Sequence, residues 1–169
     1  MPGSGKSHWM KRLAKALDYK AVDMDVYIEQ QSKKSIPELF ALSEAYFREQ
    51  ERAALEALIA GHNDQMIIAT GGGAPVYRDN MDLMKKNGLV IYLEVAPEQL
   101  VNNVARSRHK RPLLATEDPV ALSEKIKTLY RSRQNIYERA DLKISADSIS
   151  LATFAATIMD YQSKTNTGI

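Results

Sequence analysis

The sequence contains no cysteine, which excludes a disulfide framework and any metal site built on thiolates. It also lacks a strong charge of either sign, because 23 Lys and Arg residues against 21 Asp and Glu residues leave a formal net charge of +2. So small a charge gives no general argument for a nucleic-acid partner. No apolar run approaches the ~18 residues of a membrane-spanning helix, and the N-terminus has no apolar signal-peptide core. We therefore expect a cytoplasmic protein with neither a membrane nor a nucleic acid as partner.

The composition that is present is typical of one globular domain. Of the 169 residues, 44% are hydrophobic and 26% are charged, which suffices for a single core with a solvated surface. There is no internal repeat, low-complexity segment or domain-sized linker. We expect a single domain over residues 1–169 that works as a monomer, with a mobile lid at about 106–119 and a disordered tail from about 163.

Strand-like and helix-like segments alternate along the chain. Short apolar runs predict strands at 21–23, 66–70, 89–93 and 142–144. Helical spacing predicts helices over 8–17, 26–31, 44–60, 81–86, 97–105, 120–139 and 150–161, with another that starts after Ser35. This alternation indicates an α/β fold in which helices cover both faces of a parallel sheet. Ligands of such sheets bind at the carboxyl ends of the strands, where the motifs below would meet.

The first seven residues, Met1–Ser7, carry a candidate phosphate-binding loop. Gly3, Gly5, Lys6 and Ser7 match the second half of the P-loop pattern G-x-x-x-x-G-K-[ST]. Glycines let several backbone N–H groups turn toward one point, and the following helix adds its positive N-terminal dipole. Lys6 would reach the β- and γ-phosphates, and the Ser7 hydroxyl would bind Mg²⁺.

The motif is incomplete. Its first glycine would stand one place before Met1, and the hydrophobic strand that precedes a P-loop, which runs through the middle of the sheet, is absent as well. We expect either that the sequence is a fragment, for instance from a misassigned start, or that the loop is unusual. The alternative is a flexible Gly/Ser-rich N-terminus.

Two acids, Asp23 and Asp25, end the first predicted strand. Their period-2 spacing can turn both toward one side of the strand end. Phosphoryl transfer needs a carboxylate near Mg²⁺ and another that accepts the proton of the attacking hydroxyl, and two acids can divide these tasks. The alternative is a polar turn in which Asp25 caps the next helix.

Two further features are ambiguous when each is taken alone. The triple glycine at 71–73 permits close approach to a ligand, but such runs are often plain turns. Arg48 lies near the start of a helix, where the dipole disfavours a cation, so it could bind a substrate carboxylate. A surface ion pair with Glu44 or Glu51 explains Arg48 equally well.

The basic run at 106–111 could belong to a lid that closes cations over a transferring phosphoryl group. It could also be a solvated loop or a nucleic-acid patch. The lack of interleaved aromatic residues argues against the patch.

Taken together, the motifs resemble those of the shikimate kinase family over the span from Pro2 to about Tyr161. The matching features, in chain order, are G-S-G-K-S, D-x-D at Asp23 and Asp25, F-R-x-x-E at 47–51, G-G-G at 71–73, R-P-L-L at 111–114, and Arg133 before Tyr137. The resemblance implies a three-layer α/β sandwich of the P-loop kinase type. Its parallel sheet would have five strands, the first absent from this chain.

The resemblance also implies an activity: ATP, with Mg²⁺ as cofactor, would phosphorylate the 3-hydroxyl of shikimate in aromatic amino-acid biosynthesis. The implied catalytic residues are Asp25, Lys6 and Arg111. The implied shikimate-binding residues are Asp25, Arg48, Gly71, Gly72, Gly73 and Arg133. The implied nucleotide-binding residues are Gly3, Ser4, Gly5, Lys6, Ser7, His8, Arg106, Arg111 and Asp147. The implied metal-binding residues are Ser7 and Asp23.

Besides the missing strand and glycine, the chain departs from the family pattern at His8, where a second Thr or Ser is usual, and at Ser43, where glycine is usual. Two other functions stay open. One is a related small-molecule kinase of the gluconate kinase type, and the other is a non-catalytic nucleotide-binding protein with a damaged P-loop.

Overall fold

The computed structural model describes residues 1–61, 65–106, 112–114, 116, 118–146 and 148–166. It has four short strands, β1 (Lys20–Asp23), β2 (Met66–Ala69), β3 (Ile91–Glu94) and β4 (Leu142–Ser145). The helices are α1 (Lys6–Leu17), α2 (Met24–Ser32), α3 (Ile36–Leu42), α4 (Glu44–Ala60), α5 (Asn80–Asn87), α6 (Pro97–Arg106), α7 (Pro119–Tyr137) and α8 (Leu151–Asn166). Two 3₁₀ turns lie at η1 (Ala74–Val76) and η2 (Pro112–Leu114). The predicted alternation of strands and helices is confirmed.

Local sequence signals fix several of these boundaries. The Ser35 side chain accepts from the Glu38 backbone N–H, and the Glu38 carboxylate accepts from the Ser35 backbone N–H at 2.7 Å, which completes the predicted capping box of α3. Helix α4 spans the predicted residues, since Ser43 caps its start and Gly61 follows its end.

At the C-terminus, α8 continues to Asn166, past residue 163, where the sequence analysis placed the start of a disordered tail. Lys164 reaches back one helical turn to Asp160 at 2.6 Å, and the Ser163 hydroxyl donates to the Asp160 carbonyl. These contacts support a helical turn that residue composition alone did not indicate. Residues 167–169 lie outside the described part of the chain.

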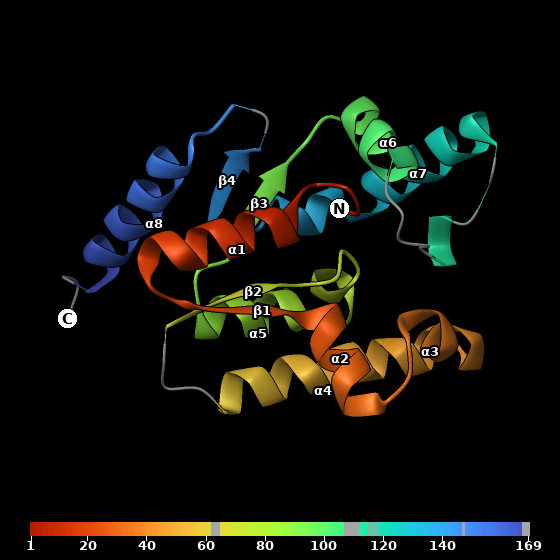
Figure 1. Cartoon of the computed structure of the whole chain (residues 1–169), viewed down its shortest axis with the longest axis horizontal. Helices are drawn as coiled ribbons and strands as arrows, with labels where there is room; N and C mark the ends of the chain where they lie inside the picture. The colour runs from red at the N-terminus through yellow and green to blue at the C-terminus, as the bar shows by residue number, and fades with distance from the viewer. Residues whose placement is uncertain (62–64, 107–111, 115, 117, 147, 167–169) are drawn as a thin grey trace.

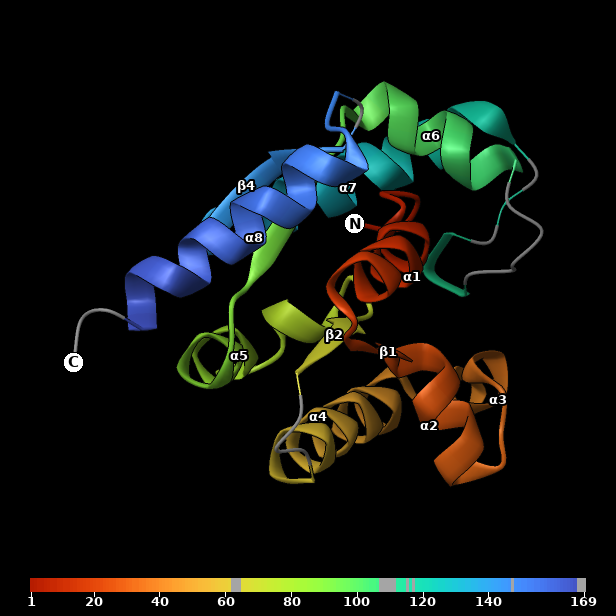
Figure 2. The same ribbon diagram turned by 60° about the vertical axis from the view of Figure 1, so that its left-hand side comes forward.

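The strands form two parallel pairs. Strand β1 pairs with β2, with Lys20 opposite Met66, and β3 pairs with β4, with Ile91 opposite Leu142. In the described part of the chain, no strand joins the two pairs. Both views show them as separate ribbons, with α1 passing close to β1 and β2 (Figures 1 and 2).

Apolar helix faces pack against each pair. Helices α1 and α8 share a buried cluster with β3 and β4, centred on Trp9, Leu13 and Phe154. Helices α2, α3 and α4 form a second cluster around Met24, Leu39 and Leu58. Among the described residues no helix is both long enough and apolar enough to cross a lipid bilayer.

Candidate functional site

The N-terminal loop that precedes α1 has the backbone that a phosphate-binding loop requires. Gly3 and Gly5 have φ angles of 80° and 82°, which L residues with a side chain rarely adopt. A Cβ atom on Gly3 would also lie 3.1 Å from Val104 and 3.2 Å from the Leu100 carbonyl oxygen of α6. Both glycines are therefore needed for this conformation, which argues against a merely flexible N-terminus.

Side chains of the loop turn inward. The Ser4 hydroxyl donates to the Met1 carbonyl at 2.9 Å, and the Lys6 ammonium donates to the same carbonyl at 2.7 Å. The Lys6 ammonium also lies 3.4 Å from the Ser4 hydroxyl. Lys6 is thus held over the loop at the N-terminus of α1, where its charge adds to the helix dipole.

Asp23 ends β1, and Asp25 lies in the first turn of α2. Asp23 caps α2, since its Oδ1 accepts from the Asp25 backbone N–H at 3.2 Å, and its Oδ2 accepts from the Ser7 hydroxyl at 2.6 Å. The alternative that Asp25 is the helix cap is wrong, because Asp23 takes that position and Asp25 lies in the first turn. One carboxylate therefore joins α1 to α2.

The Ser7 and Asp23 oxygens are suited to hold Mg²⁺. Mg²⁺ in nucleotide sites usually takes one or two protein oxygens, with phosphate oxygens and water completing the octahedron. In the described ranges, no cluster of three or more His, Asp or Glu side chains that could hold a metal by itself is present. The Asp23 carboxylate and the Ser7 hydroxyl lie 2.6 Å apart beside the loop. They fit a site in which protein, phosphate and water oxygens together bind Mg²⁺, and not a site in which the protein supplies every ligand.

Arg48 is buried in α4 between two acids. Its guanidinium donates to Glu44 at 2.9 Å and makes a short ion pair with Glu51, and it lies over the rings of Phe40 and Phe47. Burial by itself would lower the pKa of Arg48, but Glu51 and Glu44 outweigh it and the pKa is raised. The ion-pair alternative is correct in part: the pair of Arg48 with Glu44 reaches the surface, whereas the pair of Arg48 with Glu51 is buried.

Glu51 is the more deeply buried member of this pair, with 1% of its surface exposed against 8% for Arg48. Burial raises its pKa above the ordinary value, although Arg48 pulls in the opposite direction. Asp25 and Arg133 both lie close enough to affect its charge. Glu51 therefore connects the acid of α2 with the arginines of α4 and α7.

The triple glycine after β2 is the surface on which these groups meet. A Cβ atom on Gly73 would overlap the Arg48 guanidinium, and one on Gly72 would lie 3.3 Å from Arg133 Nη1. A Cβ atom on Gly71 would overlap the Glu51 carboxylate and lie 3.3 Å from Asp25 Oδ1. Absent side chains at these positions let two guanidinium groups and two carboxylates approach one short loop.

Helix α7 contributes Arg133 and Tyr137, both buried. The Tyr137 hydroxyl donates to the Gly72 carbonyl at 2.6 Å, and burial raises the pKa of Tyr137. Tyr137 thus anchors the glycine loop one helical turn from Arg133.

The structure therefore brings together most of the predicted residues. The loop residues, Asp23 and Asp25, the triple glycine, Arg48 and Arg133 lie at the carboxyl ends of β1 and β2. His8 instead faces outward on α1, where its ring nitrogen lies 3.3 Å from Arg12, and Arg106 is exposed at the end of α6. Arg111 and Asp147, with much of the expected lid, lie outside the described residues.

Sequence reasoning missed the tasks of Glu51 and Tyr137, although both stand in the motifs that it quoted. The signal for Glu51 was its place three residues after Arg48, which sets the two side chains on one helix face. No pattern in the sequence indicates that the Tyr137 hydroxyl reaches Gly72, because this contact spans 65 residues.

Comparison with known proteins gives a consistent result. The family model described as shikimate kinase matches residues 2–162. A shikimate kinase of Sulfurihydrogenibium sp. (strain YO3AOP1) is 40% identical over 146 residues, which cover 86% of this chain and 83% of the relative. A shikimate kinase of Clostridium botulinum (strain Alaska E43 / Type E3) is 40% identical over 144 residues, which cover 85% of this chain and 82% of that relative.

Solved structures give the same answer for the fold. The shikimate kinase of Bacteroides thetaiotaomicron superposes with a TM-score of 0.83 at 30% identity, covering 97% of this chain and 93% of its own. The shikimate kinase of Acinetobacter baumannii, in complex with shikimate, superposes with a TM-score of 0.84 at 28% identity, covering 97% of this chain and 89% of that protein. The resemblance and the P-loop kinase-like α/β fold that the motifs indicated are confirmed.

Proposed function

Since the chain belongs to the shikimate kinase family, we propose that it transfers the γ-phosphate of ATP to the 3-hydroxyl of shikimate, giving shikimate 3-phosphate and ADP. One observation carries the proposal. Two buried arginines and Asp25 meet at the triple glycine, beside a glycine loop with an inward lysine. A phosphorylated donor and a carboxylate-bearing alcohol need these two neighbouring subsites.

The phosphate subsite is formed by Gly3, Ser4, Gly5, Lys6 and Ser7. Backbone N–H groups and Lys6 bind the β- and γ-phosphates, and Lys6 moves from the Met1 carbonyl to the incoming oxygens. Ser7 and Asp23 would hold Mg²⁺ beside the loop, and the ion would supply positive charge that offsets the charge of the phosphates.

The alcohol subsite is formed by Asp25, Arg48, Arg133 and the loop of Gly71, Gly72 and Gly73. The two guanidinium groups clamp the shikimate carboxylate, for which a planar fork of donors is well suited. Asp25 orients the 3-hydroxyl and accepts its proton as the hydroxyl oxygen bonds to the γ-phosphorus. The bond between that phosphorus and the bridging oxygen of ADP breaks as the new bond forms.

The remaining assignments rest on the family alone. We propose that Arg111 closes over the phosphates with a lid at about 106–119, and that Arg106 and Asp147 flank the adenine. His8 follows Ser7 at the start of α1 and belongs to the nucleotide-binding set through its backbone. We place the reaction in the cytoplasm, where ATP and Mg²⁺ are available, and assign it to a monomeric single domain.

Substrate selection and product analysis test this proposal. We would incubate the protein with MgATP and either shikimate or gluconate, and then separate the products and identify them by mass spectrometry. We expect shikimate 3-phosphate and no phosphogluconate. Phosphogluconate as the main product would establish the gluconate kinase alternative instead.

A single substitution separates the enzyme from a nucleotide-binding protein. Asp25→Asn keeps the shape of the side chain but removes the proton acceptor, so we expect turnover to be lost while ATP binding, measured by calorimetry, is retained. Equal activity of the variant would remove Asp25 from the mechanism. No shikimate-dependent turnover in the original chain, together with ATP binding, would favour the binding protein.

A further inference from the structure

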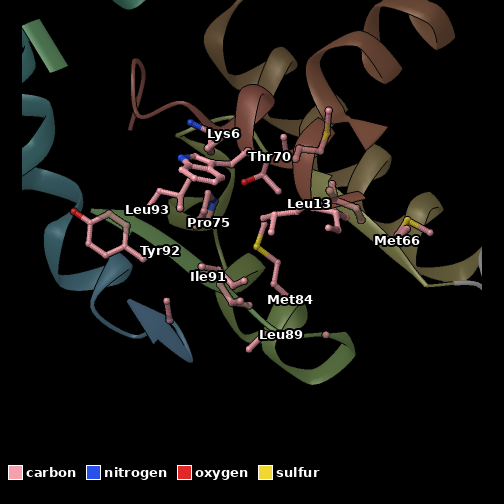
Figure 3. A pocket seen from close by; sticks show the side chains of 18 of the residues that line it. Lys6, Leu13, Met66, Thr70, Pro75, Met84, Leu89, Ile91, Tyr92 and Leu93 are labelled. Carbon is pink, nitrogen blue, oxygen red and sulfur yellow. The ribbon is translucent and has the colours of Figure 1, made fainter. Parts of the chain in front are cut away.

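Helix α6 lies beside the loop of residues 1–7 that forms the phosphate subsite (Figures 1 and 2). The same loop borders a cavity of about 600 Å³, in which Lys6 lies toward one end and Leu89 toward the other (Figure 3). The contact between α6 and the loop joins residues that are 100 positions apart in the sequence. It brings a helix that binds no substrate against the backbone of the phosphate subsite.

Helix α6 packs closely around Gly3. The Cβ position of Gly3 lies within 3.4 Å of atoms from three residues of this helix, which are Leu100, Asn103 and Val104. Leu100 is fully buried and belongs to the core cluster that includes Ile126 of α7. Because side chains in such a cluster are close-packed, α6 offers the loop a fixed surface.

One polar contact joins this surface to the loop. The side-chain Nδ2 of Asn103 donates to the Gly3 carbonyl at 2.8 Å. Gln99, one helical turn earlier, donates from Nε2 to Asn103 Oδ1 at 3.4 Å. A backbone carbonyl can only accept, so the Asn103 amide has to present its nitrogen to Gly3, and the contact with Gln99 agrees with this orientation.

The direction of the Gly3 carbonyl decides where the next N–H group points. In a planar trans peptide the carbonyl and the following N–H point in opposite directions. With the Gly3 carbonyl turned to α6, the Ser4 N–H points to the Met1 carbonyl, which it reaches at 3.4 Å. The Lys6 ammonium donates to that same carbonyl, so the two donors converge. A reversed peptide would put a carbonyl oxygen, which repels phosphate, in the place of the N–H.

We propose that Asn103 is a positioning residue for the nucleotide, because it holds the Gly3 carbonyl against α6 and thereby keeps the Ser4 N–H turned into the loop. The inference deepens the phosphate subsite of the proposed function and rests on it. Glycine has an unusually free backbone, so Gly3 does not fix this peptide by itself. A side-chain donor on an anchored helix supplies the missing restraint.

Binding of MgADP to the original chain and to three variants tests this role. Asn103→Leu keeps the branching of the side chain but removes the donor, and we expect the Kd for MgADP to rise roughly 2- to 10-fold, as for the loss of one hydrogen bond. Asn102→Leu is the matched control, because Asn102 is the preceding residue of α6 and is exposed. Calorimetry measures each Kd, and the Kd for shikimate should stay unchanged in all variants.

The third variant, Asn103→Asp, has the shape of the original side chain and still accepts from Gln99. It presents an oxygen to the Gly3 carbonyl, so two acceptors face each other. We expect MgADP binding to weaken at least as much as in Asn103→Leu. Because its shape is conserved, Asn103→Asp carries the test if the leucine variant does not fold.

An unchanged Kd for MgADP in the Asn103 variants would overturn the proposal. So would an equal rise in Asn102→Leu, which would assign the effect to the helix surface and not to the bond with Gly3. A Kd for shikimate that rises by the same factor would also overturn it, because general loosening of the fold affects both ligands. MgADP binding involves no acceptor alcohol, so failure of the shikimate assignment and failure of this proposal are separate results.

Discussion

Arg48 shows how one side chain can carry a structural and a functional task together. Its ion pairs with Glu44 and Glu51 fix the guanidinium, while the absence of a side chain at Gly73 leaves room next to it. A buried pair of this kind adds little stability by itself because desolvation offsets the attraction. Its value here is to hold a cation in one position before substrate arrives.

We expect Arg48→Ala to raise the KM for shikimate by roughly 10- to 100-fold, since a hydrogen bond to a charged group contributes about 1.5–3 kcal/mol. The KM for ATP should change little. Arg52→Ala is the matched control, because Arg52 lies on the same helix but pairs with Glu56 and Asp79. Steady-state kinetics with each substrate varied would measure both. Equal KM values for shikimate in the two variants would contradict the clamp.

Glu51 predicts a pH dependence of stability. Its pKa in the folded chain lies above the ordinary 4.5, so between these two values the folded chain binds more protons than the unfolded chain. The stability that protonated Glu51 contributes is therefore present near pH 4.5 and is lost as the pH rises through the folded pKa. Gln cannot titrate.

The quantity to compare is the free energy of unfolding of the original chain minus that of the Glu51→Gln variant. We expect this difference to fall as the pH rises from about 4.5, the ordinary pKa of Glu51. Urea unfolding of both proteins at a series of pH values measures this difference. A difference that increases with pH would mean that Arg48 outweighs burial and that the folded pKa of Glu51 is lowered.

At the scale of elements, the glycine loop after β2 joins α4 and α7 into one site. Gly73 has an ordinary φ of −88°, so alanine there meets no backbone obstacle and acts only through its methyl group. That methyl overlaps the Arg48 guanidinium. We expect Gly73→Ala to displace Arg48 and lower kcat/KM for shikimate by up to about 100-fold, as misplacement of a substrate-positioning group can.

Gly88→Ala is its control, because a Cβ atom at Gly88 meets no atom within 4 Å. Its kcat/KM for shikimate should equal that of the original chain. A normal kcat/KM in Gly73→Ala would show that the loop and Arg48 are not coupled.

Tyr137 holds the same loop from the side of α7. Tyr137→Phe removes the hydroxyl that donates to the Gly72 carbonyl at 2.6 Å and lies 3.7 Å from the Met1 sulfur, and we expect about 0.5–1.5 kcal/mol of lost stability. Because the loop then loses an anchor beside Arg133, the KM for shikimate should rise while the KM for ATP stays unchanged. Chemical denaturation and kinetics check the two parts separately. A loss of stability without a change in either KM would make Tyr137 purely structural.

Local signals explain which elements the sequence could predict. The Ser35 and Glu38 capping box acts within a few residues, so the sequence predicted it correctly, and the loop backbone at Gly3 and Gly5 has the positive φ angles that glycines permit. The hydrogen bond between Asp23 and Ser7 could not be predicted from neighbouring residues. It joins residues 16 positions apart and depends on how β1 sits beside α1.

At the scale of the whole molecule, the site is formed where segments far apart in the sequence meet. The loop before α1, the end of β1 and the loop after β2 come from three separate segments, and helices α4 and α7 add the two arginines. Alternating strands and helices predicted that these ends would share one edge, and the structure agrees. Among the described strands, β1 pairs with β2 and β3 pairs with β4, and this division into two pairs agrees with the absence of the middle strand that the P-loop motif indicated.

ADP release from MgATP, measured on this chain with and without shikimate, tests the account most directly. We predict release that depends on shikimate, saturates with it and disappears in Asp25→Asn. Release at the same rate without shikimate, or none in a chain that still binds both ligands, would contradict the claim that this site transfers phosphate to shikimate.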